Sequence, residues 1–255
     1  MPGHIALITG GGSGIGLATA KVLGLTGHTI ILADINEPAA QQQVHNLAEA
    51  GINAHAMALD VSSESSWQSV MTQIERQFER LDILVNNAGI GEGGNVQSTT
   101  FDAFQRSMSI NVGGVFLGCK YGIELIEKSG GGAVVNVSSI FGIVSDPLTL
   151  AYSASKGAVR SMTKSLALDC AARQNGVRVN SVHPGFVETP MVAQAIGSLP
   201  ADIAEEYQAR TVGLVPMARL AQAEEIAKAI AFLVSPDASF ITGTELVVDG
   251  GFTAR

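Results

Sequence analysis

The chain has 255 residues, of which 46% are hydrophobic and 15% are charged, and this balance excludes an intrinsically disordered protein. Its length lies within the range of one large α/β domain. A net charge of −8 argues against a nucleic-acid or anionic-membrane partner. The two cysteines, Cys119 and Cys170, lie far apart and lack metal-ligand spacing, so we expect neither a disulfide framework nor a bound metal.

The first residues show no basic segment followed by a long apolar one, as a secretory leader would. No run of about eighteen apolar residues occurs, so no membrane span is expected. We therefore expect a cytoplasmic protein.

Short apolar runs alternate with longer amphipathic segments, as in β-α units repeated around a parallel sheet. The apolar runs are mostly continuous, which is typical of strands covered on both faces. We predict an α/β fold with a Rossmann-type, doubly wound parallel sheet of about seven strands flanked by helices. The predicted strands are Ile5–Thr9, Thr29–Ala33, Ala54–Ala58, Ile83–Asn86, Ala133–Ser138, Arg178–His183 and Glu245–Val248. The predicted helices are Gly16–Gly27, Glu37–Gly51, Glu64–Arg80, Phe101–Lys128, Ala151–Gln174 and Glu224–Val234.

Residues that favour helix starts agree with these boundaries. Asn36 can cap the second helix, and either Ser62 or Ser63 can cap the third. Neither a linker nor a repeat interrupts the chain, so residues 1–255 are predicted to form a single domain. The segment of about 188–216 resists assignment and is interpreted as an insertion that covers a binding site, a substrate lid.

A glycine-rich turn follows the first strand and precedes the first helix. Glycines there allow positive φ angles and a close approach of the backbone to a ligand. Free N–H groups at the helix start favour an anion, so the turn predicts a pyrophosphate site. Its residues are Gly10, Ser13, Gly14, Ile15 and Gly16.

The second strand ends at Asp34, whose carboxylate can accept hydrogen bonds from both hydroxyls of an adenosine ribose. The same charge would repel a 2′-phosphate, and no Lys or Arg stands beside it in the sequence. Asp34 therefore indicates NAD in preference to NADP, although it could also be a simple loop or capping residue. Asp60 and Val61, after the third strand, are candidates for contact with the adenine ring.

Tyr152 and Lys156 are four residues apart, which places both side chains on one face of the predicted helix. An ammonium group near a phenol favours the phenolate, so Lys156 is expected to lower the pKa of Tyr152. Tyr152 would then serve as a general base for an alcohol. Taken alone, such a pair is more often found on a plain helix surface.

The pair has company, and together the motifs resemble the classical short-chain dehydrogenases/reductases. The resemblance covers essentially the whole chain, down to the Asp249-Gly250-Gly251 turn near its end. The remaining motifs, in family order and spacing, are Asn86-Asn87-Ala88-Gly89, Asn111, Ser139, Tyr152 with Lys156, and Pro184-Gly185.

The resemblance implies a role for each of these residues. Tyr152 would exchange a proton with the substrate oxygen, Ser139 would hydrogen-bond that oxygen, and Lys156 would also hold the nicotinamide ribose. Asn111 would anchor a water that links Lys156 to solvent, whereas His183 would pack or position the backbone. The cofactor would further contact Asn87, Ala88, Gly89, Pro184, Gly185, Val187 and Thr189.

Around the nicotinamide the resemblance places mostly apolar residues, which favours a hydrophobic secondary alcohol or ketone. Glu92 is the nearby charge, and its direction is left open. The assigned substrate pocket is Phe141, Ile143, Leu148, Phe186, Met191 and Leu199.

Within the family the chain looks closest to bacterial secondary-alcohol dehydrogenases, a branch with cyclopentanol dehydrogenases and (R)-specific alcohol dehydrogenases. The (R)-specific type prefers NADP, and Asp34 departs from it. The alternatives are a hydroxysteroid dehydrogenase, a 3-oxoacyl thioester reductase and a non-catalytic NAD-binding sensor. The resemblance also implies a homotetramer.

Overall fold

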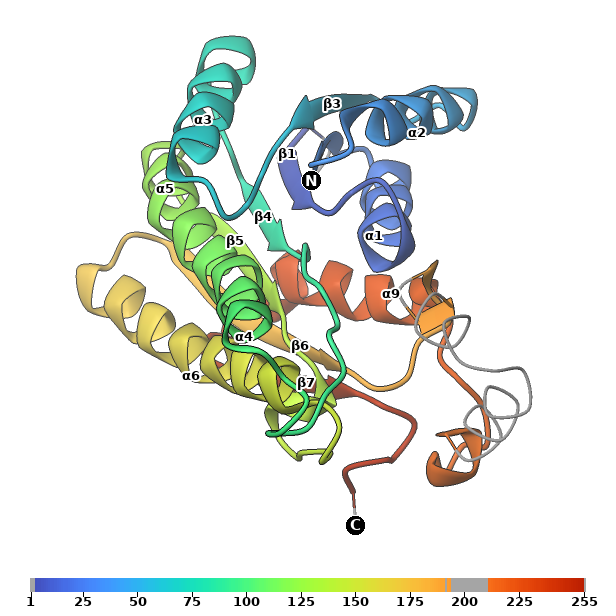
Figure 1. Ribbon diagram of the computed structural model, residues 1–255. Helices are drawn as coiled ribbons and strands as arrows, with labels where there is room; N and C mark the ends of the chain where they lie inside the picture. Colours follow the sequence, from blue (N-terminus) through green and yellow to red (C-terminus); the bar gives the residue numbers. More distant parts are fainter. Residues whose placement is uncertain (1–2, 191, 194–210, 255) are drawn as a thin grey trace.

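The computed structural model describes residues 3–190, 192–193 and 211–254. Its centre is one parallel sheet of seven strands in the order β3-β2-β1-β4-β5-β6-β7 (Figure 1). This confirms the predicted fold class, and the predicted strands are correct to within one residue at each end. The strands are β1 (Ile5–Thr9), β2 (Thr29–Asp34), β3 (Ala54–Ala58), β4 (Ile83–Asn86), β5 (Gly132–Val137), β6 (Val177–Pro184) and β7 (Glu245–Val248).

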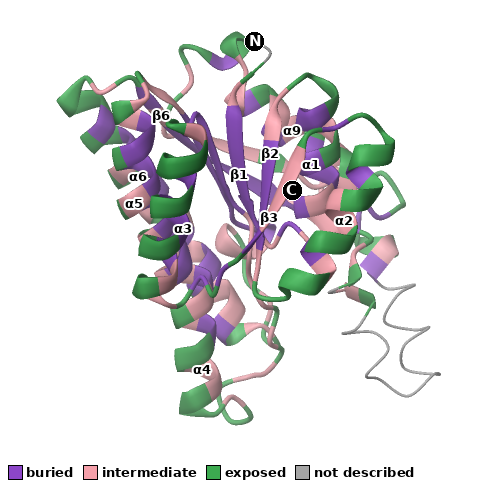
Figure 2. Cartoon of the chain, turned by 90° about the horizontal axis from the view of Figure 1, so that it is seen from above, coloured by how far each residue is buried: buried purple, intermediate pink, exposed green. Residues whose placement is uncertain are grey.

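Helices cover both faces of the sheet, which explains the continuous apolar runs of the strands. Figure 2 shows the central strands buried between the two layers. One layer contains α1 (Gly14–Leu25), α2 (Glu37–Glu49) and α9 (Ala223–Val234), and the other contains α3 (Glu64–Phe78), α5 (Gly114–Lys128) and α6 (Leu150–Arg173).

Two of the predicted caps are present. The Asn36 side chain accepts a hydrogen bond from the Ala39 N–H at the start of α2 (3.2 Å). At the start of α3, Ser63 accepts from the Ser66 N–H (3.3 Å), which decides between the two serines considered. Each cap satisfies an N–H group that has no partner inside the helix.

The predicted single helix Phe101–Lys128 is wrong in one respect. It consists of α4 (Phe101–Met108), a π-helical turn at Ser109–Gly113, and α5. The wider turn contains Asn111, which is fully buried and bonded outside the helix, as described below. Such π-helical insertions often occur at functional sites.

Part of the predicted insertion, residues 191 and 194–210, lies outside the described residues. The segment's base is described: Val187 pairs with Ala221 as an isolated parallel bridge. The Glu188 N–H also donates to the Ala221 carbonyl (2.9 Å).

The strand order reverses between β1 and β4, because the chain builds β2 and β3 on one side of β1 and then crosses to the other. The loops after β1 and β4 therefore diverge and leave a crevice at the carboxyl ends of the strands. In open α/β sheets, ligands bind at such a point.

Candidate active site

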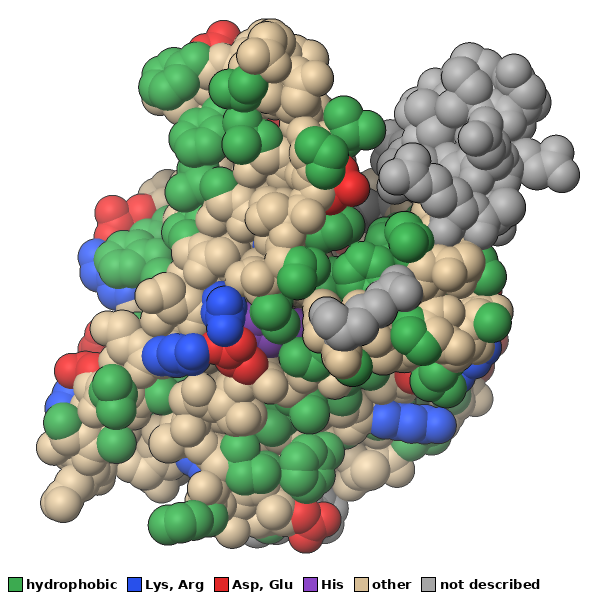
Figure 3. All heavy atoms as spheres, turned by 90° about the horizontal axis from the view of Figure 1, so that it is seen from below, with side chains coloured by type: hydrophobic (Ala, Val, Ile, Leu, Met, Phe, Trp, Pro, Cys, Tyr) green, Lys and Arg blue, Asp and Glu red, His purple; other side chains and the backbone are tan. Residues whose placement is uncertain are grey.

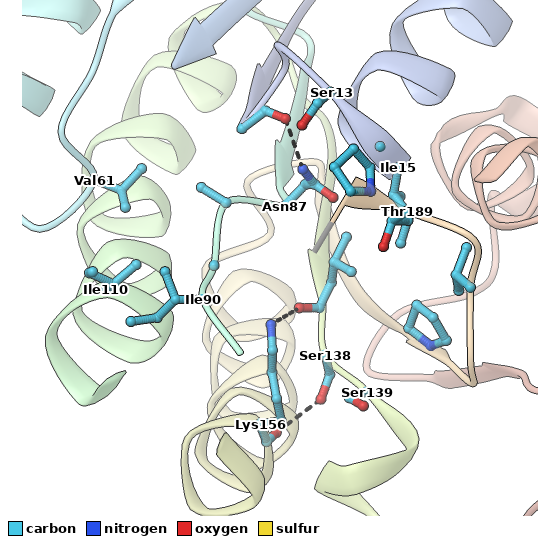
Figure 4. A pocket seen from close by; sticks show the side chains of 18 of the residues that line it. Ser13, Ile15, Val61, Asn87, Ile90, Ile110, Ser138, Ser139, Lys156 and Thr189 are labelled. Carbon is cyan, nitrogen blue, oxygen red and sulfur yellow. Dashed lines mark hydrogen bonds between the residues drawn. The ribbon is translucent and has the colours of Figure 1, made fainter. Parts of the chain in front are cut away.

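A cavity of about 440 Å³ lies at the carboxyl ends of the strands (Figure 4). It contacts residues that follow β1, β2, β3, β4, β5 and β6, together with the start of α6. Every predicted cofactor residue except Gly16 lines it. Those residues are Gly10, Ser13, Gly14, Ile15, Asp34, Asp60, Val61, Asn87, Ala88, Gly89, Tyr152, Lys156, Pro184, Gly185, Val187 and Thr189.

The turn after β1 has the geometry of an anion site. Gly10 (φ +62°) and Gly14 (φ +52°) both adopt the left-handed conformation that side chains disfavour. Ser13 stands at the N-cap of α1 without a side-chain cap, so the first N–H groups of the helix remain available to a ligand.

Gly16, predicted to contact the cofactor, instead packs the helix against the turn. A Cβ at this position would lie 2.2 Å from the Gly10 carbonyl oxygen and 2.7 Å from Asn87 Nδ2. This glycine is thus required by close packing beneath the turn.

Asp34 lies at the end of β2 with its carboxylate turned toward the glycine turn. Oδ2 accepts a hydrogen bond from the Gly12 N–H (3.0 Å) and Oδ1 accepts from the Asn36 N–H (3.0 Å). Carboxylate oxygens have further acceptor capacity, which two ribose hydroxyls can use. Among the ion pairs of the described residues, none includes Asp34.

Asp60 lines the cavity, but its carboxylate closes a turn of its own chain. Oδ1 accepts from both the N–H (2.9 Å) and the hydroxyl (2.6 Å) of Ser62. The adenine role predicted for Asp60 would thus use the oxygen that Ser62 leaves free.

Asn87 connects β4 to the glycine turn. Its Nδ2 donates to the carbonyls of Thr9 (2.9 Å) and Gly10 (3.3 Å), while the Thr9 hydroxyl accepts from the Asn87 and Ala88 N–H groups (3.0 and 2.9 Å). These bonds fix the two loops of the crevice relative to each other.

Ser139, Tyr152 and Lys156 meet at the other end of the cavity. The side chain of Ser139 hydrogen-bonds to Tyr152. The Lys156 Nζ lies 5.7 Å from the centre of the Tyr152 ring and donates to the Val137 carbonyl (2.9 Å). Ser138 takes a structural part, because its hydroxyl donates to the Lys156 carbonyl (2.9 Å; Figure 4).

Burial dominates the electrostatics of this group. It lowers the pKa of Lys156 to about 8, because the charged ammonium is removed from water. Burial also raises the pKa of Tyr152, partly offset by the hydrogen bond with Ser139. The expected lowering of the Tyr152 pKa by Lys156 is therefore not the net effect in this chain, where desolvation outweighs it.

Asn111 joins the π-helical turn to the loop after β4 and to α6. Its side chain accepts from the Ile90 N–H (2.8 Å) and donates to the Ile90 carbonyl (2.9 Å) and the Ser155 hydroxyl (3.0 Å). The side-chain amide is thus used by the protein itself, and the water predicted at Asn111 would need another group of this residue.

His183 is fully buried beneath the catalytic serine. Its Nδ1 lies 3.0 Å from the Ser139 carbonyl oxygen, which can only accept, so Nδ1 carries the proton. Nε2 lies 2.9 Å from the Ser181 hydroxyl, and burial lowers the pKa of the imidazole. The position agrees with the predicted backbone-positioning role.

The predicted substrate pocket is only partly supported. Phe141, Ile143, Leu148 and Phe186 do not line the cavity, and Met191 and Leu199 lie outside the described residues. Leu148 is 58% exposed, while Phe141 packs its ring against Tyr152 with the centroids 6.4 Å apart. Glu92, whose direction was left open, pairs with Arg106 of α4.

The cavity also has lining residues that were not assigned to the cofactor. Most are apolar neighbours of predicted residues, and a pattern of apolar positions directly after strand ends could have indicated them. They are Ile35, Leu59, Ile90, Ile110, Val137, Ser138, Pro190 and Val192.

These groups fit a nicotinamide dinucleotide. The free N–H groups after Ser13 suit its pyrophosphate, Asp34 suits its adenosine ribose, and Tyr152 with Lys156 stands at the opposite end. Among the described residues, no three His, Cys, Asp or Glu side chains come together as metal ligands, and no helix is long and apolar enough to cross a membrane.

Comparison with known proteins agrees with this geometry. A family model described as enoyl-(acyl carrier protein) reductase matches residues 10–253. Cyclopentanol dehydrogenase of Comamonas sp. (strain NCIMB 9872) is 44% identical over 251 residues, covering 98% of this chain and 97% of that protein. NADP-dependent (R)-specific alcohol dehydrogenase of Lentilactobacillus kefiri is 38% identical over 260 residues, covering 100% of this chain and 98% of that protein.

A solved structure, the crystal structure of gox2181, superposes with a TM-score of 0.93 at 31% identity, covering 100% of this chain and 97% of that one. The sequence matches and the arrangement of the sheet and cavity lead to one conclusion. The chain is an oxidoreductase that belongs to the short-chain dehydrogenase/reductase family.

Proposed function

We propose that this protein is an NAD-dependent dehydrogenase that interconverts hydrophobic secondary alcohols and ketones. The observation that carries the proposal is the cavity itself, which has the Ser139–Tyr152 hydrogen bond at one end and an Asp34 carboxylate free of ion pairs at the other. The first feature supports proton transfer to an alcohol oxygen, and the second supports recognition of an unphosphorylated ribose.

The bound nicotinamide supplies a hydride acceptor for alcohol oxidation. The alcohol oxygen would sit between the Ser139 and Tyr152 hydroxyls, with Ser139 orienting it by a hydrogen bond. Tyr152 would take the hydroxyl proton as the carbinol hydrogen leaves with its electron pair, so that a ketone forms. In the reduction of a ketone, Tyr152 would return that proton to the oxygen.

Lys156 would support this proton transfer electrostatically. Its ammonium donates to the Val137 carbonyl and has further N–H groups for the hydroxyls of the nicotinamide ribose. With a pKa of about 8, Lys156 carries a positive charge in most molecules at neutral pH, and a positive charge near Tyr152 favours its phenolate.

The preference for NAD rests on charge. A 2′-phosphate beside Asp34 would bring two negative groups together, whereas ribose hydroxyls would donate to it. The (R)-specific relative is named as NADP-dependent, so this point separates the present chain from that relative.

The choice of substrate class rests on the apolar neighbours of Tyr152 and on the relatives. The name of the cyclopentanol dehydrogenase supports a small secondary alcohol. As in the family at large, we propose a homotetramer and one domain over residues 1–255. Phe116 of α5 and Leu168 of α6 remain 51% and 72% exposed, which would suit an interface on these helices. Sedimentation of a monomer alone would contradict the tetramer.

The decisive experiment measures initial rates of the purified protein with NAD or NADP on a small alcohol panel. Suitable substrates are cyclopentanol, 2-octanol, both enantiomers of 1-phenylethanol, a hydroxysteroid and a 3-hydroxyacyl thioester. We expect NAD-linked oxidation of the simple secondary alcohols to be fastest. Activity confined to the steroid or the thioester would keep the mechanism and overturn the substrate class. Cofactor binding without any turnover would overturn the enzymatic proposal.

A further inference from the structure

Four aromatic rings form a continuous series that starts at the catalytic tyrosine. Phe141 meets Tyr152 edge-to-face with centroids 6.4 Å apart and an interplanar angle of 81°. Phe186 meets Phe141 at 6.0 Å and 81°, and Phe252 meets Phe186 at 5.5 Å and 83°. These are favourable arrangements for aromatic pairs. The series joins four segments that are distant in the sequence.

Phe252, the outermost ring, is held by a structured turn near the end of the chain. The Asp249 carboxylate accepts from the Gly251 N–H (2.9 Å) and from the Thr253 N–H and hydroxyl (2.8 and 2.6 Å). This turn lies directly against β6, because a Cβ on Gly185 would lie 2.8 Å from the Asp249 Cα. The carboxylate is used within its own turn, so it does not present an unpaired charge to the rings.

The three phenylalanines lie beside Tyr152 but outside the dinucleotide cavity. None of them lines that cavity, although Tyr152 does. Each phenylalanine is half-buried, so part of each ring is accessible. The C-terminal segment lies at the lower end of the molecule in Figure 1, and hydrophobic side chains greatly outnumber charged ones on the face seen from that end in Figure 3.

We propose that Phe141, Phe186 and Phe252 form an aromatic subsite that takes the ring-bearing substituent of the secondary alcohol. The inference rests on the proposed function and deepens it by naming the substituent and by assigning a specificity role to Phe252. Accessible ring edges and faces offer an aryl or cycloalkyl group the same edge-to-face contacts that the rings make with one another. A charged substituent would lose its hydration there without gaining a partner.

The test compares kcat/KM for 1-phenylethanol and 2-butanol in the wild type and in the variants Phe252→Leu and Phe252→Ala. The leucine keeps most of the volume but removes the ring, so it serves even where the alanine variant folds poorly. We expect the ratio of the two kcat/KM values to fall by about threefold to tenfold, the factor that one aromatic contact contributes. The change should come mainly from a higher KM for 1-phenylethanol. Phe240→Leu, which changes a fully exposed phenylalanine (104%), is the matched control and should leave the ratio unchanged.

The outcomes separate this proposal from the one on which it rests. A wild type that oxidises neither alcohol overturns both the proposed function and the subsite. An active wild type whose Phe252 variants keep the same ratio overturns the subsite alone. A loss of equal size for both alcohols shows a purely structural role for Phe252 and likewise overturns the subsite.

Discussion

Replacing Lys156 with methionine should make the stability of the protein respond differently to pH. Lys156 is 4% exposed, and its pKa is about 8 in the folded chain, against an ordinary value of 10.5. Between these two pH values the unfolded chain binds more protons at this site than the folded chain does. The free energy of unfolding of the wild type therefore gains a contribution from Lys156 as the pH rises.

The size of the effect follows from the gap between the two pKa values. Each pKa unit corresponds to about 1.4 kcal/mol, so the whole gap amounts to about 3 kcal/mol, of which about 2 kcal/mol develops between about pH 7.5 and pH 9.5. Methionine has a similar length and no charge, so the Lys156→Met variant lacks this contribution. The difference in unfolding free energy, wild type minus variant, should rise by about 2 kcal/mol over that interval.

Urea unfolding at several pH values, at one fixed protein concentration and without cofactor, measures this difference. Lys128→Met is the control. Lys128 is exposed, and its hydrogen bond with Glu124 raises its pKa, so that difference should not rise over the same interval. A Lys156→Met difference that stays constant from about pH 7.5 to pH 9.5 would refute the argument that burial depresses the pKa of Lys156. The loss of the bond to the Val137 carbonyl shifts both ends of the comparison equally.

Three further substitutions test the roles assigned to single residues. Tyr152→Phe should leave NAD binding, measured by fluorescence titration, nearly intact and lower kcat at least about 100-fold, the scale of general acid–base catalysis; substantial remaining turnover would contradict proton transfer by Tyr152. Asp34→Ala should reduce the NAD/NADP ratio of kcat/KM about tenfold or more, because a hydrogen bond to a charged group contributes about 1.5–3 kcal/mol, and an unchanged ratio would mean that another residue reads the ribose. His183→Asn can still donate to the Ser139 carbonyl and should retain far more kcat than His183→Leu at a similar cofactor affinity. Equal kcat values for these two variants would show that the bond to Ser139 has no positioning role.

Local sequence signals predict most of this fold. The strands are continuous apolar runs such as Ile5–Thr9, and Asn36 and Ser63 are capping residues of the kind that helix starts favour. The glycine turn and Asp34 are adjacent to strand ends in the sequence, so the topology of a doubly wound sheet brings them to one edge. For these residues, chain order and local propensity were sufficient.

Other features depend on contacts between distant segments, which sequence patterns do not contain. The amphipathic run Phe101–Lys128 reads as one helix, and its π-helical turn arises where Asn111 bonds with Ile90 and Ser155. Gly16 belongs to the glycine motif, yet packing against the Gly10 carbonyl keeps it out of the cavity.

The neighbours and charges of the catalytic side chains were likewise decided by tertiary structure. Spacing places Tyr152 and Lys156 on one helix face, but the direction of each pKa shift depends on how completely the sheet and loops remove both groups from water. Phe141 and Phe186 were identified from the sequence, whereas Phe252 joins them only because the Asp249 turn folds back onto β6. The sequence by itself determined which chemical groups are present and their order along the strands. Only the tertiary structure decided their desolvation and mutual contacts, because both are properties of segments that meet after folding.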